Sequence, residues 1–249
     1  MRWSFSLIGA VLALAAGIAP ASTAELVVYS STGMQAALTD IKPIYERNTY
    51  NKLTITFATA NQVKDKIVQG AEFDVAIVLP PVTDQLIEAG KIEPNVVPLA
   101  KSGLGIAFKA GASAPDVATP DSFKTALLGA KKVAFTTTGQ SGIYFSKLLD
   151  QWGIADQIKA KAIAIPSGMT AEYVAKGEAD MAMQLLAELH SVSGVQVVPF
   201  PPAVQSYLKF QGGISPASKQ KEADAAFLNF LSIPAATEVL RAKYMEPGN

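Results

Sequence analysis

The stretch KKVAFTTTGQSGIYFSKLLDQWG, residues 131–153, shows the unit from which this chain is built. Its first five residues predict a short β-strand, and the apolar spacing across residues 141–152 predicts an amphipathic helix. Hydroxyl residues, a glutamine and glycines lie between them, and glycines let a ligand approach the backbone closely. A strand, a polar turn and a helix form the repeating unit of an α/β fold.

The same unit recurs on both sides of this stretch. Apolar runs at residues 25–30, 53–58 and 74–79 are each followed by a segment of helical period, and the alternation restarts at about residue 103. We therefore predict an α/β protein with a parallel sheet and helices on both of its faces. The expected helices cover residues 35–47, 61–69, 82–89, 120–128, 141–152, 169–176, 185–189, 217–231 and 234–244.

An alternation that stops, restarts and ends in helices predicts two lobes. We expect residues 25–101 with 207–249 to form the first lobe and residues 102–206 to form the second. The chain would then cross between the lobes twice, near residues 96–105 and 199–210, and these two crossing segments would form a hinge. Two independent domains are the alternative, but no flexible linker separates the halves.

Residues 1–24 have the features of a secretory signal. Arg2 precedes a continuous apolar run at 7–18, and small residues stand at Ser22 and Ala24. The run is shorter than the roughly 20 residues that span a bilayer, which argues against the alternative of a retained anchor. We expect export to the bacterial periplasm with cleavage near Ala24. The absence of cysteine excludes disulfides and thiolate catalysis.

Composition and motifs exclude several classes of function. With 21 basic and 21 acidic side chains, the chain has no overall charge to hold nucleic acid. His190 is the only histidine, and without cysteine it cannot form a conventional metal site. No phosphate-binding loop occurs, so neither a metal nor a cofactor is expected. The enzyme alternative is a hydrolase that uses Ser141, but the motif of a nucleophile elbow is absent and no acid stands out as a partner for His190.

The polar turns that follow the strands are the candidate binding site. In open α/β sheets, ligands bind beyond the carboxyl ends of the strands, where helix N-termini present free N–H groups. Any single turn of this kind is more often a helix cap, but these turns are all uncharged, and together they predict a cleft for a small anion. The candidate residues are Ser30, Ser31, Thr32, Gly33, Thr59, Ala60, Asn61, Ser141, Gly142, Tyr144, Ser167, Gly168 and Gln184.

Several stretches resemble the periplasmic molybdate-binding proteins, a branch of the type II solute-binding proteins of ABC importers. The spacing of Gln69, Gly70 and Asp74 and the GIY at 142–144 are similar to that branch. The resemblance is clearest at residues 27–41, 56–78 and 140–153, and weaker at 171–183 and 225–244. It implies two lobes that close on a ligand, no catalysis, and an inner-membrane ABC permease as partner. We expect a monomer; a receptor that docks on a membrane sensor remains an alternative.

The resemblance also implies which residues would hold the ligand. The backbone donors of the family fall on Ser141 and Ser167. Its three side-chain hydroxyl positions fall on Gly33, Ala60 and Leu185, which carry no hydroxyl. The neighbours that could replace these donors are Ser31, Thr32, Thr59, Asn61 and Gln184.

These replacements leave two ligand classes open. Glycine and alanine in place of serine predict a wider cleft, and the amides of Asn61 and Gln184 accept as well as donate hydrogen bonds. A tetrahedral oxyanion without protons needs donors only. We therefore expect either an oxyanion of the molybdate or tungstate type or a small di- or tricarboxylic acid.

Overall fold

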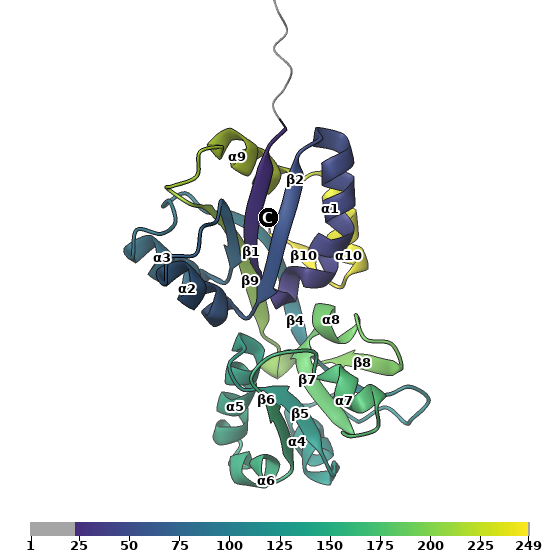
Figure 1. Cartoon of the computed structure of the whole chain (residues 1–249). Helices are drawn as coiled ribbons and strands as arrows, with labels where there is room; N and C mark the ends of the chain where they lie inside the picture. Colours follow the sequence, from purple (N-terminus) through teal and green to yellow (C-terminus); the bar gives the residue numbers. More distant parts are fainter. Residues whose placement is uncertain (1–22, 249) are drawn as a thin grey trace, which may run out of the picture.

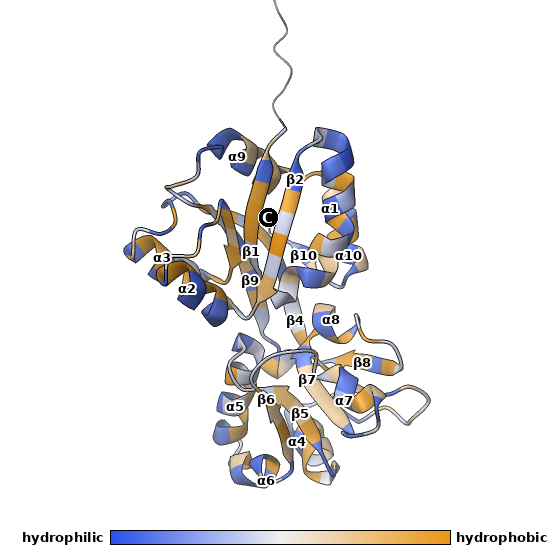
Figure 2. Ribbon diagram, viewed as in Figure 1, coloured by the Kyte–Doolittle hydropathy of each residue, from blue (hydrophilic) through white to orange (hydrophobic). Residues whose placement is uncertain are grey.

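The computed structural model describes residues 23–248 as two bodies joined by crossing strands (Figure 1). Residues 1–22 of the expected signal lie outside the described residues. Within the described part, no helix is long and apolar enough to cross a membrane. In Figure 2 strand β1 is largely hydrophobic beyond its N-terminal end, whereas helix α1 is mixed along its length.

The first lobe begins with alternating strands and helices. Strands β2, β1 and β3 are neighbours in that order and run parallel, with Val28 opposite both Ile55 and Val75. The elements are β1 (Glu25–Ser31), η1 (Thr32–Met34), α1 (Gln35–Thr49), β2 (Lys52–Ala58), α2 (Ala60–Val68), β3 (Val75–Val78) and α3 (Pro80–Glu88).

Strand β4 (Val97–Lys109) crosses from the first lobe to the second. Up to Gly103 it pairs antiparallel with β9 (Tyr207–Ile214), and from Leu104 onward it pairs with β7 (Met181–Leu185) and β8 (Val195–Pro199). Strand β9 carries the chain back and pairs antiparallel with β3. One strand in each direction therefore links the lobes.

The second lobe repeats the alternation. Strands β6, β5 and β7 are neighbours, and β5 runs parallel to both of the others. The remaining elements are α4 (Pro120–Gly129), β5 (Val133–Thr136), α5 (Gln140–Gln151), α6 (Ala155–Lys159), β6 (Ala162–Ile165), α7 (Ala171–Ala175), α8 (Leu186–Leu189) and η2 (Pro202–Val204).

The C-terminal helices return to the first lobe. Tyr45 of α1 packs edge-on against Phe227 and Phe230 at centroid distances of 5.1 and 5.2 Å. These rings belong to α9 (Lys221–Phe230), which is followed by α10 (Pro234–Ala242) and the short β10 (Glu246–Pro247) beside β4. Burial of aromatic side chains from both ends of the chain stabilises this lobe.

The elements differ from the expectation in several respects, and helix α6 and strand β10 were not expected. The sheet is not purely parallel, because β9 and β4 lie antiparallel between the two parallel sets. The sequence predicts strands at residues 103–111 and 207–210, but pairing between the crossing strands extends β4 back to Val97 and β9 on to Ile214. The lobe boundaries at 101/102 and 206/207 stay a prediction; β4 changes partners between Gly103 and Leu104.

Candidate ligand-binding cleft

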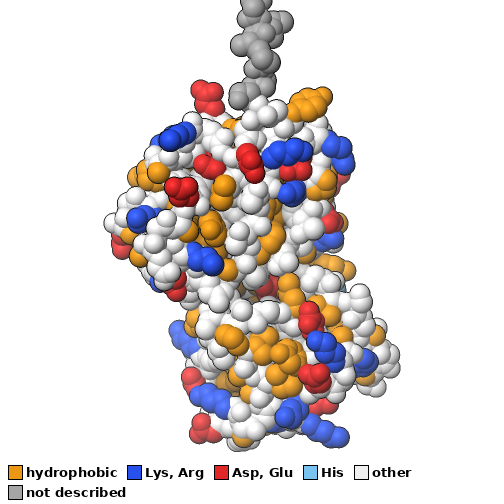
Figure 3. Space-filling view, viewed as in Figure 1, with side chains coloured by type: hydrophobic (Ala, Val, Ile, Leu, Met, Phe, Trp, Pro, Cys, Tyr) orange, Lys and Arg blue, Asp and Glu red, His pale blue; other side chains and the backbone are white. Residues whose placement is uncertain are grey.

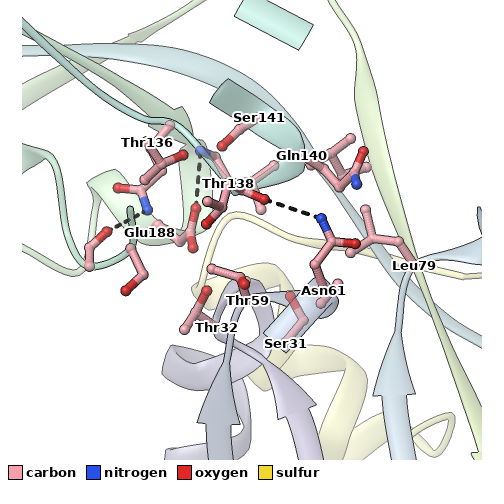
Figure 4. Close-up of a pocket in the computed structure, with 18 of the residues that line it drawn as sticks. Ser31, Thr32, Thr59, Asn61, Leu79, Thr136, Thr138, Gln140, Ser141 and Glu188 are labelled. Atoms are coloured by element: carbon pink, nitrogen blue, oxygen red, sulfur yellow. Dashed lines mark hydrogen bonds between the residues drawn. The ribbon is translucent and has the colours of Figure 1, made fainter. Parts of the chain in front are cut away.

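A cavity lies where the two lobes face each other. Figure 4 shows Ser31, Thr32 and Thr59 on one side of it and Thr136, Ser141 and Glu188 on the other. The Asn61 side-chain amide donates to the Thr138 carbonyl across the gap at 3.4 Å. The complete lining is Ser31, Thr32, Gly33, Thr59, Ala60, Asn61, Leu79, Thr136, Thr138, Gly139, Gln140, Ser141, Ser167, Gly168, Gln184, Leu185, Glu188, Leu208 and Phe210.

The first lobe contributes the beginnings of two helical segments. Ser31 precedes η1 without a side-chain cap bond, so the N–H groups that follow it are not satisfied by that side chain. Thr59 caps α2. Its hydroxyl oxygen accepts from the Gln62 N–H at 3.3 Å, and the Thr59 N–H donates to the Gln62 side-chain oxygen at 3.1 Å. A hydroxyl that accepts in this way still has its own proton to donate. Thr59 can therefore cap its helix and bind an anion.

The second lobe contributes the N-terminus of α5 and the hydroxyl-rich turn before it. Gly139 precedes this helix and offers no side-chain cap, so its first N–H groups are available to a ligand. The hydroxyls of Thr137 and Thr138 donate to the carbonyls of Ile165 and Pro166, which ties this turn to the next one. The Thr136 hydroxyl is buried and has no hydrogen-bond partner in the described part of the chain. Of the three threonines, Thr136 is thus the one whose hydroxyl is left for a ligand.

The Gln184 side chain stabilises the turn at residues 166–170 through hydrogen bonds. The Gln184 amide donates to the Gly168 carbonyl at 2.9 Å and accepts from the Thr170 N–H and hydroxyl, each at 2.9 Å. Gly168 has a φ of +113°, a backbone conformation that side chains disfavour. The Gln184 side chain therefore positions Ser167 and Gly168.

Most of the expected residues meet at the cavity, and three do not. The Ser30 hydroxyl donates to the Ser31 carbonyl at 3.2 Å, and the Tyr144 hydroxyl donates to the Val204 carbonyl at 2.9 Å. Gly142 packs α5 onto β5, since a Cβ there would lie 1.6 Å from the Thr136 carbonyl oxygen. Those at the cavity are Ser31, Thr32, Gly33, Thr59, Ala60, Asn61, Ser141, Ser167, Gly168 and Gln184.

The expectation of a wider cleft is wrong at Gly33. A Cβ on Gly33 would lie 2.5 Å from Phe210 Cζ and 2.8 Å from Leu185 Cδ1. The space that a serine side chain would occupy is filled by a ring from the crossing strand β9 and a leucine from the second lobe. Glycine at this position allows close approach of the lobes.

Sequence reasoning missed several lining residues, and Glu188 is the most consequential. Thr136, Thr138, Gly139 and Gln140 lie in the quoted stretch and could have been named with Ser141. Leu79 follows β3, and Leu208 and Phe210 come from the crossing strand, whose position only the tertiary structure gives. No capping box marks Glu188 in the sequence, because Leu185, three residues before it, has no side-chain oxygen to accept a bond in return.

The Glu188 carboxyl is buried in the wall of the cavity. The side chain is 5% exposed, and its Oε2 accepts a weak hydrogen bond from the Leu185 N–H at 3.4 Å. Burial disfavours the charged form and raises the pKa of Glu188 to about 7, although hydrogen bonds with Leu185, Thr32 and Gln184 partly oppose this. Among the described residues, no Lys, Arg or His lines the cavity. In Figure 3 the visible Lys and Arg side chains are scattered over the surfaces of both lobes.

His190 lies outside this cavity. Its ring stacks on Tyr244 with centroids 3.4 Å apart and an angle of 7° between the planes. Ser141 therefore has no histidine as a base, and the hydrolase alternative gains no support. Within residues 23–248, no cluster of acidic and histidine side chains is suited to hold a metal ion.

Two α/β lobes, crossing strands and a polar cavity between the lobes define the architecture of a type II periplasmic binding protein. The chain belongs to the family of bacterial extracellular solute-binding proteins, whose model matches residues 26–246. The resemblance to molybdate-binding proteins is confirmed at the level of sequence and fold.

Two curated relatives and one solved structure illustrate the similarity. The chain is 29% identical over 230 residues to an aconitate isomerase from Pseudomonas sp, covering 89% of this chain and 87% of that protein. It is 25% identical to the molybdate-binding protein ModA of Azotobacter vinelandii, covering 96% and 97%. The solved structure of a periplasmic molybdate-binding protein from Azotobacter vinelandii superimposes with a TM-score of 0.75 at 18% identity, covering 88% and 98%.

Proposed function

We propose that this solute-binding protein captures a small anion in the cleft between its lobes and delivers it to an ABC permease in the inner membrane. The observation that carries the proposal is the Thr136 hydroxyl, buried without a partner beside the uncapped N-terminus of α5. Helix N-termini and neutral donors can balance a buried anion without cations. The proposal includes a periplasmic location and a monomer.

We favour a small polycarboxylic acid as the ligand. The hydroxyl positions of the molybdate-binding branch fall on Gly33, Ala60 and Leu185, which carry no hydroxyl. The relative that is 29% identical is named for an acid with three carboxyl groups. An oxyanion is the second ligand class, because two of the similar proteins are named for molybdate.

Titration calorimetry of ligand-free protein tests the proposal. The panel contains citrate, cis-aconitate, trans-aconitate and succinate, with molybdate, tungstate and sulfate as the oxyanion arm. We expect micromolar or tighter binding of one polycarboxylate and none of the oxyanions. Binding of molybdate alone would show that the ligand is an oxyanion and not a polycarboxylate, and the proposed receptor role would stand. No heat from any anion would contradict the proposal.

A second candidate function is isomerisation of an unsaturated acid in the same cleft. It is favoured by the relative named an aconitate isomerase and by Glu188, whose pKa of about 7 suits a group that accepts and returns a proton. Incubation of the wild type with trans-aconitate, followed by chromatography, tests it. Conversion that is lost in Glu188→Gln would favour the enzyme, and unchanged substrate would favour the receptor alone.

A further inference from the structure

Glu188 lies between two cavities that separate the lobes. On one side it lines the central cleft with Thr32, Thr136 and Ser141. On the other side it lines a second cavity with Asp40, His190 and Lys243, which lies between α1, α8 and the end of α10. The carboxyl therefore faces the first lobe while its helix belongs to the second.

Within residues 23–248, no Lys, Arg or His forms an ion pair with this carboxyl. Lys243, which also lines the second cavity, is paired with Asp40 at 2.7 Å. His190 is stacked on Tyr244, and burial lowers its pKa, so that its ring is neutral at pH 7 and above. The groups that hydrogen-bond Glu188 itself are neutral: the Thr32 and Gln184 side chains and the Leu185 N–H.

An anion in the central cleft would therefore meet Glu188 directly. A second negative charge nearby disfavours ionisation of a carboxyl. Burial already raises the pKa of Glu188 to about 7, so protonation at neutral pH is readily reached. Once protonated, the carboxyl has an O–H to donate and becomes one more donor, close to the hydroxyl positions that are missing at Gly33 and Leu185.

We propose that Glu188 contacts the ligand in its protonated form, so that capture of an anion takes up one proton from solution. This inference rests on the proposed function, since it requires that the central cleft binds an anion. It assigns Glu188 as a residue that determines specificity. The cleft accepts an anion only together with a proton, and its affinity falls as the pH rises above about 7 by up to tenfold per pH unit.

Calorimetry in buffers of different ionisation enthalpy measures the proton uptake. The probes are trans-aconitate, citrate and molybdate, titrated at pH 6, 7 and 8. At pH 8 we expect uptake that approaches one proton per ligand bound, because Glu188 is mostly ionised in the free protein at that pH. At pH 6 the uptake falls toward zero, since the carboxyl already holds its proton.

Two variants separate Glu188 from other sources of the proton. Glu188→Gln keeps a neutral side chain with N–H donors and can still cap α8, so we expect pH 6 affinity within about threefold of the wild type, no uptake and a flat pH profile. His190→Gln is the control, because His190 is the other titratable group near the second cavity; it should keep the wild-type uptake. Uptake that persists in Glu188→Gln would assign the proton to the ligand and overturn the inference.

Other outcomes are equally decisive. A probe that binds without proton uptake at pH 8 overturns this inference and leaves the proposed function intact. A hundredfold or greater loss in Glu188→Gln at pH 6 overturns it too, since Glu188 would then act as an ionised acceptor. If no anion binds, both proposals fall. Without any ligand, carbon NMR of the Glu188 carboxyl must give a pKa well above the ordinary 4.5.

Discussion

A buried carboxyl such as Glu188 destabilises the folded state whenever it is ionised. Its pKa is about 7 in the folded protein against an ordinary value of 4.5, so between these values the folded state binds more protons than the unfolded state. Its contribution to stability is therefore present below about pH 4.5 and is lost as the pH rises through 7. The raised pKa is caused by burial, and the weak hydrogen bond from the Leu185 N–H only partly opposes it.

Glu188→Gln should stabilise the protein at high pH. At pH 8 we expect the free energy of unfolding to rise by up to about 3 kcal/mol, because a neutral amide replaces a buried charge. At pH 4 the two proteins should be nearly equal. Urea unfolding at both pH values measures the difference. Glu178→Gln, at an exposed position of the same lobe, is the control for loss of one negative charge, and an equal gain there would contradict the prediction.

At the scale of an element, the threonine hydroxyls in the turn before α5 fall into two groups: two bind the neighbouring turn and one has no partner there. Thr137 and Thr138 bind the carbonyls of the neighbouring turn and hold the two turns together. Thr136, at the end of β5, is left without a partner beside the first turn of the helix. An unpartnered buried hydroxyl costs free energy, so its presence at a helix N-terminus is best explained by a ligand that it binds.

Thr136→Val should separate stability from binding. We expect the free energy of unfolding without ligand to stay equal or rise by up to about 1 kcal/mol, because an unsatisfied hydroxyl is removed. The affinity for the ligand should fall at least about tenfold, equivalent to about 1.4 kcal/mol. Thermal unfolding and calorimetry measure the two quantities. Thr136→Ser, which keeps the hydroxyl, should bind like the wild type; unchanged affinity in the valine variant would remove Thr136 from the site.

For the whole molecule, the proposed function depends on how closely the lobes can approach. Strands β4 and β9 form the hinge, where the Gln205 side chain bonds both the N–H and the carbonyl of Leu104 at 2.8 and 3.0 Å. Gly33 in the first lobe lies against Leu185 in the second and Phe210 in the returning strand. Since the ligand is expected to contact both lobes, closure and binding are linked.

Gly33→Ala should hold the lobes apart. The added Cβ would clash with Phe210 and Leu185, so we expect ligand affinity to fall at least about tenfold. The radius of gyration in the presence of ligand should exceed that of the wild type. Small-angle X-ray scattering and calorimetry test both effects. Gly129→Ala, at the end of α4 where a Cβ meets no other atom, should change neither quantity, and a normal closed form of Gly33→Ala would refute the prediction.

The sequence by itself determined most of the elements and the place of the cleft. Residues 131–153 became β5, its polar turn and α5 as expected, because apolar period and turn residues act within a few positions of the chain. Within each lobe the polar turns lie at one edge, because the carboxyl ends of parallel strands lie at one edge of a sheet. The crossing strands then bring the two edges together at one cavity.

Only the tertiary structure decided what that cavity contains. Pairing of β4 with β9, remote in sequence, set the length of the crossing strands and brought Phe210 against Gly33. Packing between lobes buried Glu188, which changed an ordinary helix-cap residue into a group with a pKa of about 7. Neighbouring turns used the hydroxyls of Thr137 and Thr138 and left that of Thr136 free. Burial, close approach and the choice of hydrogen-bond partner depend on residues distant in sequence, and local patterns do not encode them.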